Sequence, residues 1–313
     1  MTPNPRVALV FPGQGTQFVG MGEDVYNASP AARAVFDLSD KVLGFALSRL
    51  CFAGPGEELR QTANAQPAIV TVSLALVAAI QQSPWLSSVH LFAGHSLGEY
   101  SALAAAGVVS IADAILLVRR RGKLMQQAGD NIPGAMSAVI GLDESSLKII
   151  CQETGVFVAN YNCPGQIVIS GTAAGVKAAG RLALEKGARR VMPLPVSGAF
   201  HTPLMAQAAG ELAVAIDRIK WANPSLPVIT NIAAVPTSSV SAIKADLTAQ
   251  LTHPVRWQKS IAAAATLGVD TFVEVGPGQY LTGLIKRINP GSRVINIGDV
   301  ATVNKYSKQG LDS

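Results

Sequence analysis

The run GHSLGEYSAL, residues 94–103, constrains the fold of this chain more than any other feature. An apolar stretch, residues 91–93, precedes the run, and residues 97–106 have helical character. Gly-x-Ser-x-Gly between a strand and a helix is the pattern of a nucleophile elbow, whose glycines allow a sharp turn. Chance could produce so short a pattern, but the strand–turn–helix context favours catalysis. Ser96 would then lie at a helix N-terminus, where free N–H groups can stabilise an oxyanion.

A serine nucleophile needs a base, and histidine is the usual one. The histidines of the chain are His90, His95, His201 and His253. His95 lies inside the elbow and is expected to point away from the serine hydroxyl, whereas His90 is expected in a polar surface turn. His253 precedes a proline, which favours extended backbone. His201 follows a strand-like run and a small-residue turn, a place where α/β enzymes put catalytic groups. It is the predicted base, and a buried structural histidine is the alternative.

An acid that completes a hydrolase triad would come between the serine and the histidine. The acids considered for this role are Asp113, Asp130, Asp143, Glu144, Glu153 and Glu185. None has the context of a strand end. A backbone or amide carbonyl could orient the imidazole instead, which indicates a Ser–His dyad rather than a standard α/β-hydrolase triad.

One arginine stands out by helical periodicity within residues 111–128. At about 100° per residue, Arg121 falls on the face of the apolar positions. These positions are Ile111, Ala114, Val118 and Met125, whereas Arg119, Arg120 and Lys123 lie on the other side. A buried arginine needs an anionic partner. Two explanations stay open: an internal ion pair, or a receptor for the free carboxylate of a dicarboxylic acyl group, which a guanidinium can bind with two parallel hydrogen bonds.

Charge and glycine content exclude two classes of partner. The net charge is only +5, and the short basic runs at 119–121 and 189–190 lack interleaved aromatic residues, so we expect no nucleic-acid partner. Residues 13–15, Gly-Gln-Gly, follow a strand but lack the third glycine and the acidic residue of a dinucleotide site.

Other features indicate a cytoplasmic protein. Cys51, Cys151 and Cys163 are scattered and form no Cys-x-x-Cys pair, so reduced thiols are expected rather than disulfides or metal ligands. The N-terminus has no signal-peptide layout. The apolar helix expected over residues 68–80 is too short to span a membrane.

The 313 residues exceed the usual size of one hydrophobic core. Short apolar strands alternate with helices, which predicts an α/β fold with a mostly parallel, hydrolase-like sheet covered by helices. These strands are expected over residues 6–11, 91–93, 228–231 and 271–275. A βαββαβ pattern between them predicts an inserted ferredoxin-like subdomain. Its strands are expected over 135–140, 156–161, 166–170 and 190–194, and its helices over 144–153 and 173–186.

The predicted organisation is a large subdomain of residues 1–128 and 196–300 and a small subdomain of residues 129–195. Residues 301–313 are polar and are expected to form a flexible tail. The active site is expected in the cleft between the two subdomains.

Six motifs occur in order along the chain. They are FPGQGTQ (11–17), GHSLGEYSAL (94–103), RGKLMQ (121–126), NCPGQIVISG (162–171), GAFHTPLM (198–205) and EVGPG (274–278). Together they resemble malonyl-CoA:acyl carrier protein transacylases, the stand-alone acyltransferases of fatty-acid and polyketide synthesis, over residues 5–297. The resemblance implies ping-pong transfer of a malonyl group from malonyl-CoA to the phosphopantetheine thiol of an acyl carrier protein. It implies no metal, no bound cofactor and no membrane partner, and a monomer is expected.

The resemblance also assigns residues. Arg121 would bind the malonyl carboxylate, and backbone N–H groups of Gln14 and Leu97 would form the oxyanion hole. Gln250 would orient the base through its carbonyl and line the pocket. Further substrate-binding positions are Phe200, which suits malonyl rather than bulkier extenders, Met125, Asn160 and Asn162. The chain departs from the family at Arg256, where glutamine is frequent.

Two other functions stay open. One is an acyl hydrolase of the same fold that clears carrier proteins, against which Arg121 argues because a hydrolase has no evident need for a carboxylate receptor. The other is a non-catalytic carrier-protein docking module, against which the presence of both Ser96 and His201 argues.

Overall fold

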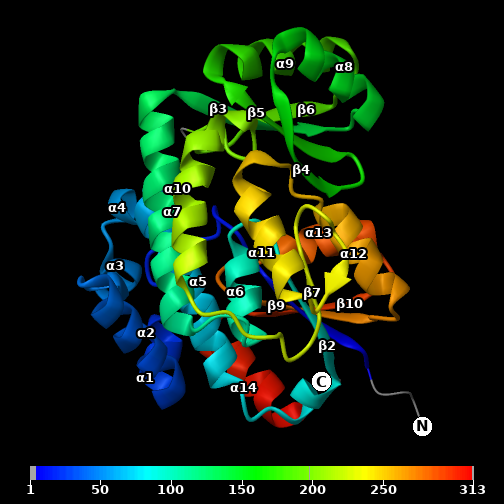
Figure 1. The fold of residues 1–313 in the computed structure, drawn as a ribbon. Helices are drawn as coiled ribbons and strands as arrows, with labels where there is room; N and C mark the ends of the chain where they lie inside the picture. Colours follow the sequence, from blue (N-terminus) through cyan, green and yellow to red (C-terminus); the bar gives the residue numbers. More distant parts are fainter. Residues whose placement is uncertain (1–4, 197, 312–313) are drawn as a thin grey trace.

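A six-stranded sheet forms the centre of the protein, in a computed structural model that describes residues 5–196 and 198–311 (Figure 1). Its strand order is β10-β9-β1-β2-β7-β8, and every pairing is parallel except that of β7 with β8. The strands are β1 (Val7–Phe11), β2 (Val89–Gly94), β7 (Val228–Ile229), β8 (Pro236–Thr237), β9 (Thr271–Val275) and β10 (Arg293–Ile297). The four predicted strands all lie in this sheet, whereas β8 and β10 were not predicted.

Both faces of the sheet are buried, and β1 shows how. Val7, Leu9 and Phe11 belong to one hydrophobic cluster, and Ala8 and Val10 belong to another. Alternate residues of a strand point to opposite faces, so a continuous apolar run marks a strand buried on both sides. The predicted hydrolase-like class is therefore confirmed.

Helices pack on both faces of the sheet. The first cluster contains residues of α1 (Glu23–Ala28), α2 (Pro30–Leu43), α3 (Leu47–Ala53), α4 (Gly56–Arg60), α5 (Thr62–Ala79), α6 (Gly98–Ala105), α7 (Ile111–Asn131), α10 (Ala206–Arg218) and α11 (Val240–Ala249). The second contains residues of α12 (Trp257–Thr266) and α13 (Tyr280–Ile288).

Helix α5 is longer than the sequence indicated. It begins at Thr62, six residues before the expected start at residue 68, and contains Pro67, which lacks the N–H of a helical hydrogen bond. The carbonyl of Ala63, which Pro67 cannot bond, accepts a hydrogen bond of 2.6 Å from Arg119. By length and composition α5 is long enough to cross a membrane, and the expectation that it is too short is wrong. However, 83 % of it is buried inside the protein, as in the core helix of a globular domain.

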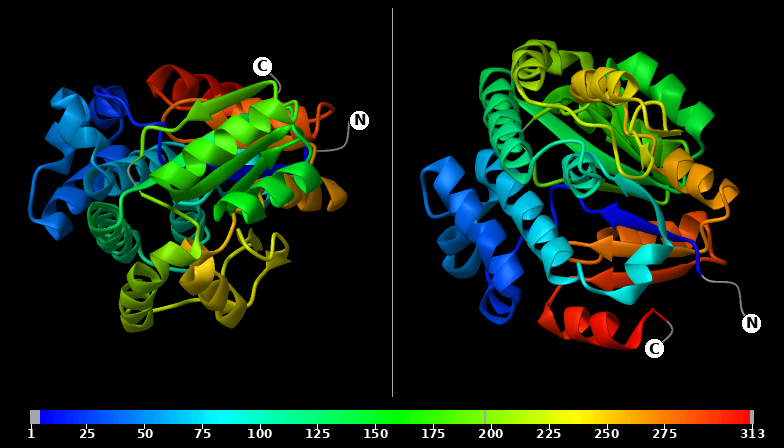
Figure 2. Two further views of the ribbon diagram at one scale, coloured as in Figure 1. Left: turned by 90° about the horizontal axis from the view of Figure 1, so that it is seen from above. Right: turned by 60° about the horizontal axis from the view of Figure 1, so that its bottom comes forward.

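The inserted subdomain has the predicted βαββαβ order. It comprises β3 (Gly134–Ile140), α8 (Glu144–Thr154), β4 (Phe157–Cys163), β5 (Gln166–Thr172), α9 (Ala173–Glu185) and β6 (Arg190–Pro193). Its four strands form an antiparallel sheet in the order β4-β5-β3-β6. Figure 1 shows α8 and α9 on the outer side of this sheet, and the view from above in Figure 2 shows the sheet lying over the large subdomain. The subdomain borders remain a prediction.

A short backbone link joins the two parts. Tyr161 in β4 donates to the carbonyl of Val255, and the Val255 N–H donates to Ala159, both at 2.9 Å. The edge strand of the small sheet is thus tied to the segment that leads into α12.

The predicted flexible tail is wrong as far as Gln309, because α14 (Val300–Gln309) is helical and docked. Asp299 and Thr302 form a capping box at its start. Trp85 donates to the carbonyl of Tyr306 at 3.0 Å, and Val303 is buried. The apolar residues of α14 lie three apart and alternate with polar ones, so the sequence did not show a clear helical pattern. The right view of Figure 2 shows α14, in red, along the bottom of the molecule.

Candidate active site

Ser96 lies on a tight turn between β2 and α6. Its φ of 51° lies in the left-handed region, which is uncommon for a residue other than glycine. The flanking glycines are required by space: a Cβ at Gly94 would lie 2.0 Å from the carbonyl carbon of Gly98, and one at Gly98 would lie 2.1 Å from the carbonyl oxygen of Phe11. The turn has the geometry of the predicted nucleophile elbow.

Asn231, two residues after the end of β7, holds this turn through two hydrogen bonds. Its Oδ1 accepts from the Ser96 backbone N–H at 2.6 Å, and its Nδ2 donates to the carbonyl of Gly94 at 2.7 Å. The side chain is buried. Backbone strain of roughly 1–3 kcal/mol persists only where surrounding contacts over-determine it. Asn231 supplies two such contacts, and sequence reasoning did not single it out.

The structure brings Ser96 and His201 together. His201 Nε2 lies 2.8 Å from Ser96 Oγ, and its Nδ1 lies 2.9 Å from the backbone carbonyl of Gln250. Because a carbonyl only accepts, Nδ1 carries the proton and Nε2 is free to accept one. Burial, together with the Arg121 cation, lowers the pKa of His201 to about 3, so the imidazole is neutral at neutral pH. A carbonyl thus occupies the place of a triad acid.

Arg121 lies on the buried face of α7 and is only 1 % exposed. Its Nη2 donates to Ser96 Oγ at 3.2 Å and to Gln250 Oε1 at 3.1 Å. Its Nε is buried without a partner. Among residues 5–196 and 198–311 it forms no ion pair, so an internal carboxylate in direct contact does not explain it. A buried cation beside the nucleophile is therefore available to an incoming anion.

Gln250 connects these groups and is fully buried in the turn η3 (Gln250–Thr252). Its side-chain Nε2 donates to the carbonyl of Ser96 at 3.1 Å and to Glu99 Oε2 at 2.6 Å. Sequence reasoning missed Glu99. The available signal was an acidic residue one turn after Ser96 on a short helix that is otherwise buried and apolar.

The two amides of the predicted oxyanion hole lie in adjoining segments. A Cβ at Gly13 would lie 2.7 Å from the carbonyl oxygen of His95, so the loop that carries Gln14 runs directly against the elbow. The Gln14 side chain is held by Thr62 and Gln66 at 3.2 and 3.4 Å. Within the described part of the chain, neither the N–H of Gln14 nor that of Leu97 donates a hydrogen bond.

His95 points away from the dyad, as expected. Its Nε2 lies 2.9 Å from Asn162 Oδ1, and Asn162 Nδ2 donates to the Tyr280 hydroxyl at 3.1 Å. Asn160 and Asn162 are both buried on β4, and in the described part of the chain no hydrogen bond joins either side chain to Ser96 or His201. Their role in the substrate pocket remains a prediction.

The predictions for the other two histidines, His90 and His253, had different outcomes. The expectation for His90 is wrong: it is half-buried within β2, and its Nδ1 lies 2.6 Å from the Ser88 carbonyl. His253 has the expected extended backbone, with φ −124° and ψ 153°.

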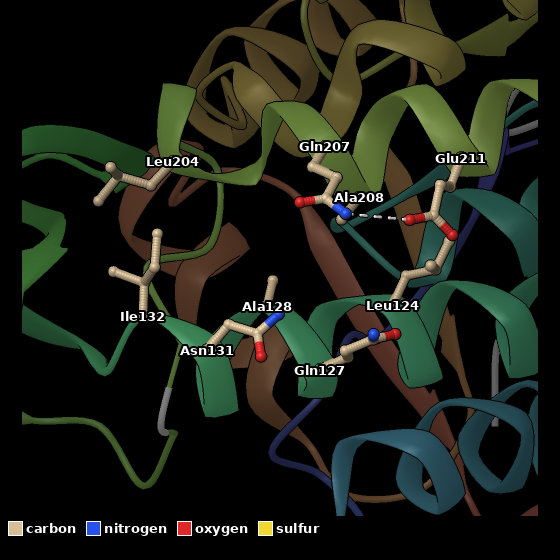
Figure 3. A pocket seen from close by; sticks show the side chains of 9 residues that line it. All are labelled: Leu124, Gln127, Ala128, Asn131, Ile132, Leu204, Gln207, Ala208 and Glu211. Atoms are coloured by element: carbon tan, nitrogen blue, oxygen red, sulfur yellow. Dashed lines mark hydrogen bonds between the residues drawn. The ribbon is translucent and has the colours of Figure 1, made fainter.

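Met125 and Phe200 are buried in the same hydrophobic cluster. The sulfur of Met125 accepts from Gln66 Nε2 at 3.2 Å, and Phe200 precedes His201 directly. A small cavity of about 50 Å³ opens between α7 and α10, close to both segments (Figure 3). Its lining residues are Leu124, Gln127, Ala128, Asn131, Ile132, Leu204, Gln207, Ala208 and Glu211. None of them belongs to the centre formed by Ser96, His201, Arg121 and Gln250.

Comparison with known proteins identifies the family of this chain. The acyl transferase domain family matches residues 8–310. A malonyl CoA-acyl carrier protein transacylase of Bacillus subtilis is 46 % identical over 303 residues, covering 95 % of each chain. The chain belongs to the malonyl-CoA:acyl carrier protein transacylase family.

Solved structures of this family superimpose closely. The acyl-carrier-protein S-malonyltransferase of Bartonella henselae matches with a TM-score of 0.91 and 41 % identity, covering 96 % of this chain and 97 % of its own. A malonyl-transacylase solved in complex with a type II polyketide synthase acyl carrier protein matches at TM-score 0.91 and 40 % identity, covering 96 % and 98 %. The transacylase fold is therefore shared along nearly the whole chain.

Other expectations concern cysteines and metals. Cys51, Cys151 and Cys163 are buried and free of disulfides. In the described ranges, no group of three or more His, Cys, Asp or Glu side chains is placed to hold a metal ion. That the protein works without a metal or bound cofactor remains a prediction.

Proposed function

We propose that this protein transfers the malonyl group of malonyl-CoA to the phosphopantetheine thiol of an acyl carrier protein. The observation that supports this most strongly is the buried Arg121 guanidinium, whose Nη2 lies 3.2 Å from Ser96 Oγ and which forms no ion pair with any carboxylate of the described residues. A malonyl thioester bound at Ser96 carries a free carboxylate that such a cation can receive. Arginine is suited to this because its planar fork binds a carboxylate through two parallel hydrogen bonds.

The first half-reaction forms a malonyl-serine. His201 Nε2 takes the proton of the Ser96 hydroxyl as Oγ attacks the thioester carbonyl. The N–H groups of Gln14 and Leu97 hold the tetrahedral oxyanion. The carbon–sulfur bond then breaks, and the departing CoA thiolate takes the proton from His201.

The second half-reaction runs the same chemistry in reverse. The thiol of the carrier protein loses its proton to His201 and attacks the malonyl-serine carbonyl. The bond to Ser96 Oγ breaks, and His201 returns a proton to the serine. Each proton enters and leaves through one imidazole, whose tautomer the Gln250 carbonyl holds fixed.

Other roles of pocket residues are also part of the proposal. Phe200 and Met125 would form the apolar wall near the acyl group, and Asn160 and Asn162 would face the pocket from β4. Cytoplasmic location, a monomeric state and independence of any cofactor stay predictions of the same proposal.

Intact-mass measurement tests the proposal directly. Mixing the protein with malonyl-CoA should add one malonyl group, and Ser96→Ala should abolish the adduct. His201→Ala should slow its formation by about 10²–10⁴-fold. Addition of holo carrier protein should then remove the adduct and malonylate the carrier. Stoichiometric acylation of the Ser96→Ala protein would contradict the assignment, and no acylation of the parent would favour a docking module.

A further inference from the structure

Glu99 is a carboxyl group that is buried against Gln250 and that the proposed chemistry does not use. It lies on α6, three residues after Ser96, and is 0 % exposed. Its Oε2 accepts from Gln250 Nε2 at 2.6 Å, whereas its Oε1 is buried without a partner. It takes part in no ion pair within the described residues. A buried carboxyl without a paired cation is costly, so its position calls for a reason.

In the observed orientation, both Nε2 hydrogens and the Oε1 oxygen of the Gln250 side-chain amide have hydrogen-bonding partners. Both Nε2 hydrogens have acceptors, Glu99 Oε2 and the Ser96 carbonyl, and Oε1 accepts from Arg121 Nη2. The two ends of an amide are nearly equal in shape, so hydrogen bonding decides which end points where. A half-turn of this amide would face Nε2 against the Arg121 donor and Oε1 against two oxygens.

Of the two acceptors, Glu99 holds the amide more firmly. Its contact is 2.6 Å, against 3.1 Å for the Ser96 carbonyl, and a carboxylate is the stronger acceptor when it is ionised. A protonated Glu99 would still present an acceptor oxygen to Nε2, so the amide keeps its direction in both states. Burial raises the pKa of Glu99 well above its usual value.

We propose that Glu99 is a positioning residue for substrate choice: it fixes the Gln250 amide so that Oε1 holds Arg121 beside Ser96. This inference rests on the proposed function, in which Arg121 receives the malonyl carboxylate. Gln250 then does two separate things. Its backbone carbonyl holds His201, and its side chain, set by Glu99, holds Arg121. Loss of Glu99 should therefore reduce the preference for malonyl and leave the base unaffected.

Two variants separate this role from a merely structural one. Glu99→Met has similar length and no acceptor, so the Gln250 amide loses the shorter of the two hydrogen bonds that hold Nε2 and keeps only the one to the Ser96 carbonyl. Glu99→Gln retains a carbonyl oxygen that can accept from Nε2. We expect kcat/KM for malonyl-CoA relative to acetyl-CoA to fall by about tenfold or more in Glu99→Met, the loss typical of a charged hydrogen bond. The ratio should be retained in Glu99→Gln, and the pH profile of acetyl transfer, which depends on His201 and the Gln250 backbone carbonyl, should be unchanged in both.

Each contrary outcome has a definite meaning. Equal losses of malonyl and acetyl transfer in Glu99→Met, with a lower melting temperature, would show a structural role and overturn the proposal. A loss of preference in Glu99→Gln as large as in Glu99→Met would show that charge, not amide orientation, matters. If Glu99→Met does not fold, Glu99→Asp withdraws the carboxyl by one methylene, and an unchanged ratio there would overturn the proposal. A parent enzyme that does not prefer malonyl would contradict the proposed function itself.

Discussion

At the scale of single residues, the three consecutive arginines of α7 have three different environments. Arg119 donates to the carbonyl of Ala63 at the start of α5, and exposed Arg120 pairs with Glu211 at 2.8 Å. Only Arg121 faces Ser96. Helical periodicity alone separates them, because successive residues point about 100° apart. For the same reason, the position of Arg121 on the buried face of the helix could be predicted from the sequence.

Arg121→Ala should lower malonyl transfer far more than acetyl transfer. A hydrogen bond to a charged group contributes roughly 1.5–3 kcal/mol, so selectivity should drop by about ten- to a hundredfold. The fold should persist, because no contacting carboxylate would lose its partner. Arg120→Ala is the matched control and should keep the parent ratio. Competition between the two acyl-CoA substrates measures this ratio, and equal losses for both substrates would favour a structural role for Arg121.

The pH dependence of acylation follows from His201. Burial and the nearby Arg121 cation lower its folded pKa from 6.5 to about 3. The base must be neutral, and lowering its pKa extends the neutral form to more acidic solution. The single-turnover rate of malonyl-serine formation should therefore stay level as pH falls through 6.5, down to about pH 5. A decline with a midpoint near 6.5 would show that His201 titrates as an ordinary solvated histidine.

At the scale of elements, the strand–turn–helix unit of the elbow depends on a neighbouring strand. Asn231 follows β7 and bonds both Ser96 and Gly94. Asn231→Ala removes both hydrogen bonds and leaves buried backbone groups unsatisfied, at about 1–3 kcal/mol each. We expect a lower melting temperature and slower acylation by malonyl-CoA and acetyl-CoA alike, because the nucleophile and not the carboxylate receptor is disturbed. A change in selectivity without a change in stability would contradict this role.

The elements of the fold differ in how well a local sequence pattern predicts them. The elbow, the parallel core strands and the βαββαβ insertion were predicted, because residues close together in the sequence determine their patterns. Strand β10 and helix α14 were missed because their apolar residues are interleaved with polar ones. Asn231 and Glu99 were missed for another reason. Their partners lie 135 and 151 residues away, so no window of sequence displays the contact.

At the scale of the whole molecule, both subdomains meet at the segment that carries the base. A Cβ at Gly134, where β3 begins, would lie 2.3 Å from the backbone nitrogen of Ala199, two residues before His201. Asn162 of β4 reaches His95 of the elbow. The small sheet therefore contacts the segments that carry His201 and His95, and a cleft between the two subdomains that holds the acyl group remains a prediction.

This arrangement predicts how long the malonyl-enzyme survives. A transferase must keep its acyl-serine from water until a thiol arrives, whereas a hydrolase must not. In the proposed arrangement Arg121 holds the carboxylate and apolar Phe200 and Met125 form the pocket wall, so an entering water would be poorly placed for attack. A thiol delivered on the phosphopantetheine arm would be positioned, which can contribute on the order of several kcal/mol. The adduct should therefore outlast many turnovers in buffer.

Decay of the intact-mass adduct measures this lifetime. Holo carrier protein or free CoA should discharge the malonyl-enzyme quickly, because each supplies a thiol to the carbonyl beside His201. The apo carrier protein is the matched control: it presents the same protein surface without the thiol and should not accelerate decay. Rapid decay in buffer alone, unaffected by any acceptor, would mean that water reaches the acyl-serine as readily as a thiol does. The protein would then be a hydrolase of the same fold.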